Sequence, residues 1–142
     1  MTDLGELTID RVFRADRADV FHAYVTPERF VDFWGPEGTH VPLESVTIEP
    51  FAGGRFESTM VVDGTDRSFP LDAVFETVTE PELLAFRVRG TTMLSTIHLT
   101  DLGDGRTAVR LHQTDVPPQY LGPQAEAGLN SSLDRLAAHL AG

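Results

Sequence analysis

Apolar and polar residues alternate along most of this chain, which is the pattern of β-strands that bury one face. Two turn dipeptides, Asp63-Gly64 and Asp104-Gly105, stand between such segments and predict tight hairpins. The expected strands cover residues 6–14, 45–49, 55–62, 67–79, 83–89, 91–102 and 106–114. Together they predict an antiparallel sheet of six or seven strands.

Two short helices are expected between the first strand and the rest of the sheet. Asp16 precedes an apolar pattern and is expected to be the N-cap of the first helix. Thr26 and Pro27 have the residue types of an N-cap and a first helical position, so they begin the second helix. An aromatic cluster follows, which we expect to plug one end of the core: Phe30, Phe33 and Trp34.

The C-terminal stretch, residues 122–141, has a helical period. Its leucines recur at i, i+4, i+7 and i+11: Leu129, Leu133, Leu136 and Leu140. Ala125 and Ala137 extend this apolar stripe, and Pro123 suits the first helical position. Polar residues cover the other side: Gln124, Glu126, Asn130, Ser131, Asp134, Arg135 and His139.

Such a helix is about 30 Å long and needs a large apolar surface to pack on. Because strands precede it almost throughout, the sequence predicts an α+β fold with this helix on one face of an antiparallel sheet. The length of 142 residues predicts a single domain that spans 1–142.

Composition excludes several classes of function. The net charge of −11 disfavours nucleic acid as a partner, because its phosphates would be repelled. All 11 basic residues are Arg, which excludes a Schiff-base lysine, and the lack of Cys excludes thiolate nucleophiles and disulfides. No apolar run is long enough for a membrane span, and the acidic N-terminal segment lacks a hydrophobic signal core. We therefore expect a cytoplasmic protein with no cofactor and no metal.

A set of short motifs resembles one protein family in order and spacing. The motifs are Arg11-Val12-Phe13 with Ala15, Val20-Phe21-His22-Ala23, Thr26-Pro27-Glu28, Phe33-Trp34-Gly35-Pro36, Gly53-Gly54-Arg55-Phe56, Glu76 with Glu80-Pro81-Glu82-Leu83-Leu84, Gly105-Arg106-Thr107, and Gly128 with Leu133-Asp134-Arg135-Leu136. Over essentially its whole length, the chain resembles bacterial proteins similar to the C-terminal domain of the activator of Hsp90 ATPase. That family belongs to the START-like (SRPBCC) superfamily.

The resemblance implies a helix-grip fold, in which a curved antiparallel sheet surrounds a long C-terminal helix and two short helices plug one end. It also implies a cavity between helix and sheet, and a link to the stress response. Roles in the superfamily include carriage of apolar molecules, polyketide cyclisation, hydrolysis and co-chaperone work. The family often has Gly-Trp where this chain has Gly128-Leu129, so the smaller Leu129 either enlarges a cavity or is compensated by neighbours.

Strand parity indicates which side chains would face such a cavity, because alternate residues share a face. If Val109 and Leu111 are core, Gln113 points inward, and the family's polar position also falls on Gln113. Met60 and Met93 are expected to be core filler or flexible pocket lining. The candidate ligand-binding residues are Tyr24, Phe33, Trp34, His40, Phe56, Met60, Met93, Gln113, Gly128 and Leu129.

Three of these candidates have more specific expected roles. Trp34 lies beside the loop residues Gly35-Pro36 and is the best gate residue. His40 follows that loop and is the most plausible titratable group near a cavity mouth. Tyr24, on the first short helix, is placed to point a hydroxyl inward.

The outer face of the sheet offers a weaker candidate site. His98 and His112 are residue types that bind metals, but a third ligand at a convincing spacing is missing, so a solvated strand face is expected. Arg87 is expected on the solvated side, with Glu76 paired to an Arg. Catalytic residues stay unassigned, because residues from different strands would leave no linear motif.

Three functions are therefore considered. We expect a small-molecule binding protein for an apolar or amphipathic ligand. The first alternative is a cavity enzyme of the cyclase or hydrolase type, which needs an inward titratable group with a perturbed pKa. The second is an Hsp90-interacting module, which we do not expect, because the full activator has a further domain and this chain is acidic. The sequence leaves open whether the protein forms a homodimer.

Overall fold

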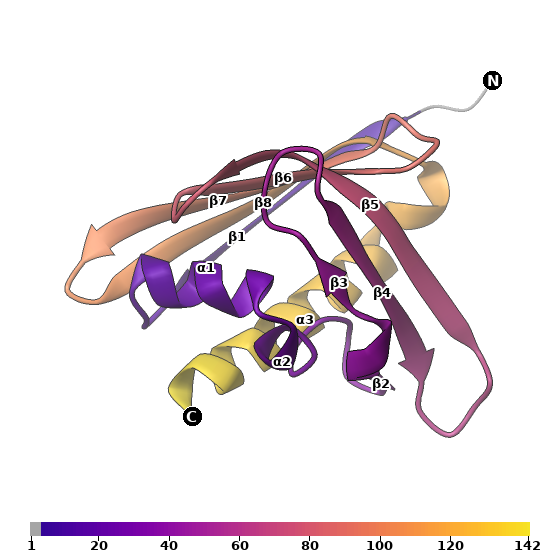
Figure 1. The fold of residues 1–142 in the computed structure, drawn as a ribbon, viewed down its shortest axis with the longest axis horizontal. Helices are drawn as coiled ribbons and strands as arrows, with labels where there is room; N and C mark the ends of the chain where they lie inside the picture. The colour runs from indigo at the N-terminus through magenta and orange to yellow at the C-terminus, as the bar shows by residue number, and fades with distance from the viewer. Residues whose placement is uncertain (1–3) are drawn as a thin grey trace.

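The computed structural model describes residues 4–142, and this part of the chain forms one sheet, three α-helices and two 3₁₀-helices (Figure 1). In chain order the elements are β1 (Gly5–Phe13), α1 (Arg17–Val25), α2 (Pro27–Phe30), β2 (Thr39–His40), η1 (Leu43–Ser45), β3 (Thr47–Ile48), β4 (Arg55–Val62), β5 (Ser68–Thr79), β6 (Leu83–Val88), β7 (Leu94–Gly103), β8 (Arg106–Val116), η2 (Pro118–Tyr120) and α3 (Pro123–Ala141).

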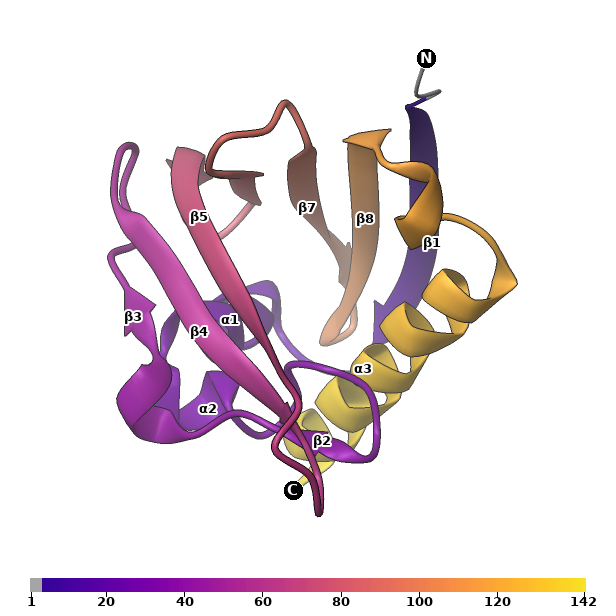
Figure 2. The same cartoon turned by 90° about the vertical axis from the view of Figure 1, so that its right-hand side faces the viewer.

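The strands follow the order β1-β8-β7-β6-β5-β4-β2, each antiparallel to its neighbour, and β3 pairs separately with β4. The first strand therefore pairs with the last one, with Ile9 opposite Leu111. Figure 2 shows the curved sheet with α3 running along its concave side and with α1 and α2 at one end. This arrangement confirms the predicted α+β helix-grip fold.

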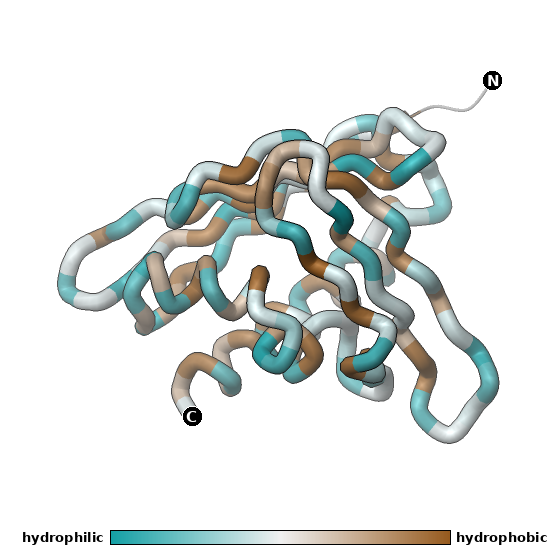
Figure 3. The backbone as a smooth tube through the Cα atoms, viewed as in Figure 1, coloured by the Kyte–Doolittle hydropathy of each residue, from teal (hydrophilic) through white to brown (hydrophobic). Residues whose placement is uncertain are grey.

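Strand parity decides which face of the sheet is buried. Ile97 and Leu99 on β7 and Val109 on β8 are at most 3% exposed, as alternation predicts. His98, between Ile97 and Leu99, and Arg110, next to Val109, are exposed on the opposite face. The two residues lie opposite each other in the register of β7 and β8. In Figure 3 apolar and polar positions accordingly alternate along much of the sheet.

Several boundaries differ from the predicted ones. Segment 45–49 was expected to be one strand, but only Thr47–Ile48 is. The Ser45 backbone N–H and hydroxyl both donate to the Pro42 carbonyl oxygen, at 3.0 and 2.7 Å, so the chain turns there as η1. The short elements β2 and η2 were not predicted. Strand β7 begins at Leu94 rather than at residue 91, because a turn precedes it.

The helix starts lie where the cap residue types predicted. Asp16 and Thr26 occupy the N-cap positions of α1 and α2, and Pro27 is the first residue of α2. Neither side chain makes a capping hydrogen bond, however. Asp16 and Thr26 therefore define the starts of α1 and α2 by their extended backbone conformation. The two helices are stabilised by the buried aromatic residues that follow the caps.

The apolar stripe of α3 is only partly as predicted. Leu133 and Leu136 are buried, whereas Ala137 is exposed and does not extend the stripe. His139 was expected on the solvated side, but its side chain is only 15% exposed. It lies between Asp32, 3.0 Å from its Nδ1, and Arg29, whose Nε donates to its Nε2 at 3.1 Å. These contacts attach the end of α3 to α2.

Candidate functional site

A cavity of about 350 Å³ lies between α3 and the inner face of the sheet. Four strands, the first helix, η2 and the loop after α2 complete its wall. The lining residues are Tyr24, Trp34, Gly35, Pro36, Met60, Phe86, Met93, Ser95, Thr96, Ile97, Leu111, Gln113, Tyr120, Gln124, Ala125, Gly128, Leu129, Ser132 and Leu133. The lining is mainly apolar, which is typical of a site for a small organic molecule.

The sheet contributes the residues that parity placed inward. Gln113 lies opposite Ser95 across β7 and β8, and its Nε2 donates to the Ser95 Oγ at 3.2 Å. This bond satisfies one donor of the amide and leaves its carbonyl oxygen and its second N–H for another partner. Met60 on β4 and Met93, just before β7, also line the cavity.

Helix α3 widens the cavity at Gly128. A Cβ atom built on Gly128 would meet no heavy atom within 4 Å, so this glycine faces open space. Leu129, where the family often has Trp, lines the same space. Gly128 and Leu129 therefore both border cavity space, as expected if the smaller Leu129 enlarges the cavity.

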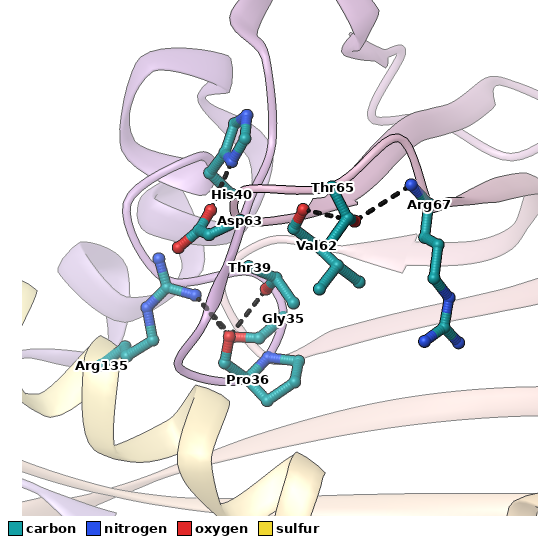
Figure 4. A network of polar contacts seen from close by, with 9 residues as sticks. All are labelled: Gly35, Pro36, Thr39, His40, Val62, Asp63, Thr65, Arg67 and Arg135. Atoms are coloured by element: carbon teal, nitrogen blue, oxygen red, sulfur yellow. Dashed lines mark hydrogen bonds and ion pairs between the residues drawn. The ribbon is translucent and has the colours of Figure 1, made fainter.

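The loop that follows α2 is held against α3 by hydrogen bonds. Arg135 Nη1 donates to the carbonyl oxygens of Gly35 and Pro36 at 2.8 and 3.1 Å (Figure 4). The Ser132 hydroxyl donates to the Phe33 carbonyl oxygen at 2.7 Å. Arg135 was expected on the solvated side of the helix. Its guanidinium instead fixes the loop that carries Trp34.

Trp34 forms part of the cavity wall. Its ring stacks on Phe30 with a centroid distance of 4.7 Å. Gly35 comes next, with φ of +93°, and a Cβ there would approach the Met60 Sδ to 2.6 Å. The loop therefore needs glycine at this position both for its backbone conformation and for the packing of Met60.

Tyr24 places its side chain at the end of the cavity next to α1. It is 3% exposed and packs edge-on against Phe33, with ring centroids 5.1 Å apart. Burial raises the pKa of the Tyr24 hydroxyl above its ordinary value of about 10, because the phenolate would lose its hydration. The hydroxyl therefore stays protonated and can donate a hydrogen bond into the cavity.

This raised pKa gives a direct prediction. The Tyr120→Phe variant keeps Tyr24 as its single tyrosine, since the chain has 2. At about pH 10 a free tyrosine is half ionised, but we expect this variant to show almost no tyrosinate ultraviolet absorbance while folded. Unfolding in denaturant at the same pH should restore half of the full signal. A folded variant that absorbs as strongly as the unfolded one would contradict the burial of the hydroxyl.

Three of the ten candidate residues do not line the cavity. His40 is exposed on β2, with its Nδ1 2.6 Å from Asp63 Oδ1 (Figure 4). Phe33 and Phe56 are 1% and 2% exposed and belong to the core behind the cavity wall. His40 does not reach the cavity because its imidazole pairs with Asp63 in the turn after β4. Phe33 does not line the cavity because Tyr24 and α3 cover its ring.

Some lining residues were not among the candidates. Tyr120 is 56% exposed and Gln124 is also exposed, so the cavity opens to solvent beside η2 and the start of α3. The turn η2 has no periodic signal, although Pro117-Pro118 marks a break after the last strand. Ser132, two positions beyond the predicted polar residue Asn130, was also missed.

The sequence profile of one family, described as "Activator of Hsp90 ATPase homolog 1-like protein", matches residues 14–141. The chain belongs to this family. Comparison with curated proteins gives no significant match.

Several solved structures share the fold of this chain. A protein from Chromobacterium violaceum has a TM-score of 0.84 at 21% identity, over 96% of this chain and 97% of that chain. An AHSA1-like protein from Aeromonas hydrophila has a TM-score of 0.83 at 18% identity, over 96% and 92%. The AHSA1 protein from Silicibacter pomeroyi has a TM-score of 0.77 at 23% identity, over 96% and 98%. At these identities the likeness shows the fold.

The chemistry available to this member of the activator-like family is limited by its cavity. Among residues 4–142, no Asp, Glu, His or Arg side chain lines it. General acid–base catalysis needs a group whose pKa lies near the working pH, whereas the pKa of Tyr24 is raised. The lining can therefore hold and orient a molecule by shape and by neutral hydrogen bonds.

The outer face of the sheet, within residues 4–142, carries exposed ion pairs and histidines. Glu76 and Arg87 pair there in the exposed position that parity predicted. Within the described part of the chain, no group of three His, Cys, Asp or Glu side chains is arranged to hold a metal. His98 and His112 lie on this exposed face, and the Nε2 of His112 is 4.0 Å from Glu6. None of the helices in residues 4–142 is long and apolar enough to cross a membrane.

Proposed function

We propose that this protein binds a small, mainly apolar molecule in the cavity between α3 and the sheet. The observation that carries the proposal is the open space beside Gly128, because a closed helix–sheet interface would leave no room for a ligand. A folded protein gains little from an unfilled cavity, since empty volume forfeits packing. A bound molecule would recover those contacts.

The candidate residues that line the cavity supply the contacts of this proposal. Met60, Met93 and Leu129 offer flexible apolar surface, which suits ligands of varied shape. Tyr24 and Gln113 supply the neutral polar groups that would orient the ligand. The absence of an acidic, basic or imidazole side chain from the lining, within residues 4–142, favours binding over a cyclase or hydrolase reaction.

Two measurements test this function. Native mass spectrometry of freshly purified protein should show a retained small molecule in part of the population. After its removal under denaturing conditions and refolding, the protein should take up the neutral dye Nile red in a saturable way, with one dye per chain. Protein that never retains a molecule and gives only weak, unsaturable dye fluorescence would count against the proposal.

The finer expectations from the sequence stay predictions. They are a single domain over residues 1–142, a cytoplasmic location, a role in the stress response, and the possibility of a homodimer. Co-chaperone activity has its own test: addition of the protein should leave the ATPase rate of a bacterial Hsp90 unchanged.

A further inference from the structure

The cavity has a hydrogen-bond donor without a partner at its inner end. Tyr24 is 3% exposed, and its hydroxyl makes no hydrogen bond with any residue in 4–142. A hydroxyl that faces a mainly apolar cavity gains from a partner, because a polar group removed from water without a hydrogen bond costs free energy. Because the phenol lines the cavity and stays protonated, it is set to donate to an acceptor atom of a bound molecule.

A second polar position lies toward the mouth. Gln113 and Ser95 face each other there, two residues along their strands from the apolar pair Leu111 and Ile97. The mouth itself is marked by the exposed ring of Tyr120. The cavity thus has an inner donor, an apolar middle and a polar amide near its opening.

The helix gives the scale of this arrangement. Gln124 lies at the mouth end and Ser132 lies near Phe33, against which Tyr24 packs. Eight residues of α-helix separate the two, and at 1.5 Å each they span about 12 Å. A ligand that bridges mouth and inner end therefore has to be an elongated molecule of about this length.

Charge sets the remaining condition on the ligand. No lining residue within the described part of the chain carries a formal charge, and the nearest basic group on α3, Arg135, is bonded to the carbonyls of Gly35 and Pro36. An ionised group loses its hydration in such a site and gains no counter-charge. The net charge of −11 further opposes an anion.

We propose that the ligand is an uncharged, elongated, mainly apolar molecule whose inner end carries a hydrogen-bond acceptor, such as an ester or ketone carbonyl, for the Tyr24 hydroxyl. This inference rests on the proposed function, because it names the chemical class of ligand for the same cavity. It separates carbonyl-bearing neutral molecules from fatty acids, which have the same apolar chain but end in an anion.

Three probes of similar length test the inference: methyl decanoate, decanoate and decane, each measured by displacement of Nile red at about pH 8, where a carboxylic acid is ionised. We expect methyl decanoate to bind at least about tenfold more tightly than decanoate. In the Tyr24→Phe variant, methyl decanoate should lose about three- to tenfold in affinity, the range for one neutral hydrogen bond. Decane should bind that variant as it binds the wild type, which shows that the cavity is intact.

Ser58→Ala is the matched control. It also removes an interior hydroxyl, but the Ser58 Oγ is buried without a hydrogen-bond partner and does not line the cavity. All three probes should therefore bind Ser58→Ala as they bind the wild type.

The outcomes are distinguishable. If decanoate binds as tightly as the ester, or if Tyr24→Phe weakens ester and decane equally, the inference is overturned and the binding function stands. If Nile red and all three probes fail to bind the wild type, the proposed function fails and the inference falls with it.

Discussion

Gly128→Phe should lower the affinity for Nile red at least about tenfold, a loss of about 1.4 kcal/mol or more in binding free energy. The side chain would start from a Cβ position with no heavy atom within 4 Å and would extend into the cavity. The fold should survive, because glycine within a helix is about 1 kcal/mol less favourable than alanine, and phenylalanine lies between the two. The thermal unfolding midpoint should therefore stay level or rise.

Ala127→Phe provides the control for this experiment. Residue 127 neighbours Gly128 on α3 but is exposed and does not line the cavity. The same added ring should leave dye binding unchanged there. Equal binding by wild type, Gly128→Phe and Ala127→Phe would show that the dye binds elsewhere and that the cavity is not the site.

Gly54→Ala should destabilise the protein by about 3 kcal/mol, at the upper end of the usual cost of overpacking. A Cβ on Gly54 would lie 2.0 Å from the carbonyl oxygen of Glu49, a backbone atom that cannot rotate away. The Gly54 carbonyl also accepts a hydrogen bond from the Phe75 N–H at 2.9 Å, so movement of this segment would disturb β5. Urea denaturation gives the free energy, and the melting temperature should fall by about 10 °C.

The adjacent glycine separates steric overlap from backbone strain. Gly53 has φ of +87°, but a Cβ there meets nothing within 4 Å. Gly53→Ala should therefore cost only the left-handed backbone penalty of about 1–2 kcal/mol. A Gly53→Ala variant as unstable as Gly54→Ala would mean that conformation, not the contact with Glu49, dominates both sites.

The elements that depend on local periodicity were predictable from the sequence. Alternation correctly placed Val109 and Gln113 on the inner face, and segment 55–62 was predicted with its observed bounds. The failures lie where a few individual hydrogen bonds, rather than a repeated pattern, decide the structure. Two-residue strands such as β2 are too short for a pattern, and the turn at η1 depends on hydrogen bonds from Ser45 to Pro42.

The same division applies to the cavity. Leu129 was predicted because its helix has a clear inward face, and Met93 because the alternation of the strand that follows extends back to it. His40 was expected near the mouth on the ground of its position after a loop, but its partner is Asp63. Arg135 looked solvated on a helical wheel, and only the folded chain brings the Gly35 carbonyl to its guanidinium.

The pairing of the first strand with the last one has a consequence for synthesis and folding. Ile9 and Leu111 lie roughly 100 residues apart in sequence yet are direct neighbours, and pairs so distant are slow to form because a long loop must close first. During translation β1 leaves the ribosome long before β8 exists. Its apolar face, with Leu7, Ile9 and Phe13, therefore stays unpaired until β8 has been synthesised. During this interval, chaperone binding or aggregation would compete with folding of the nascent chain.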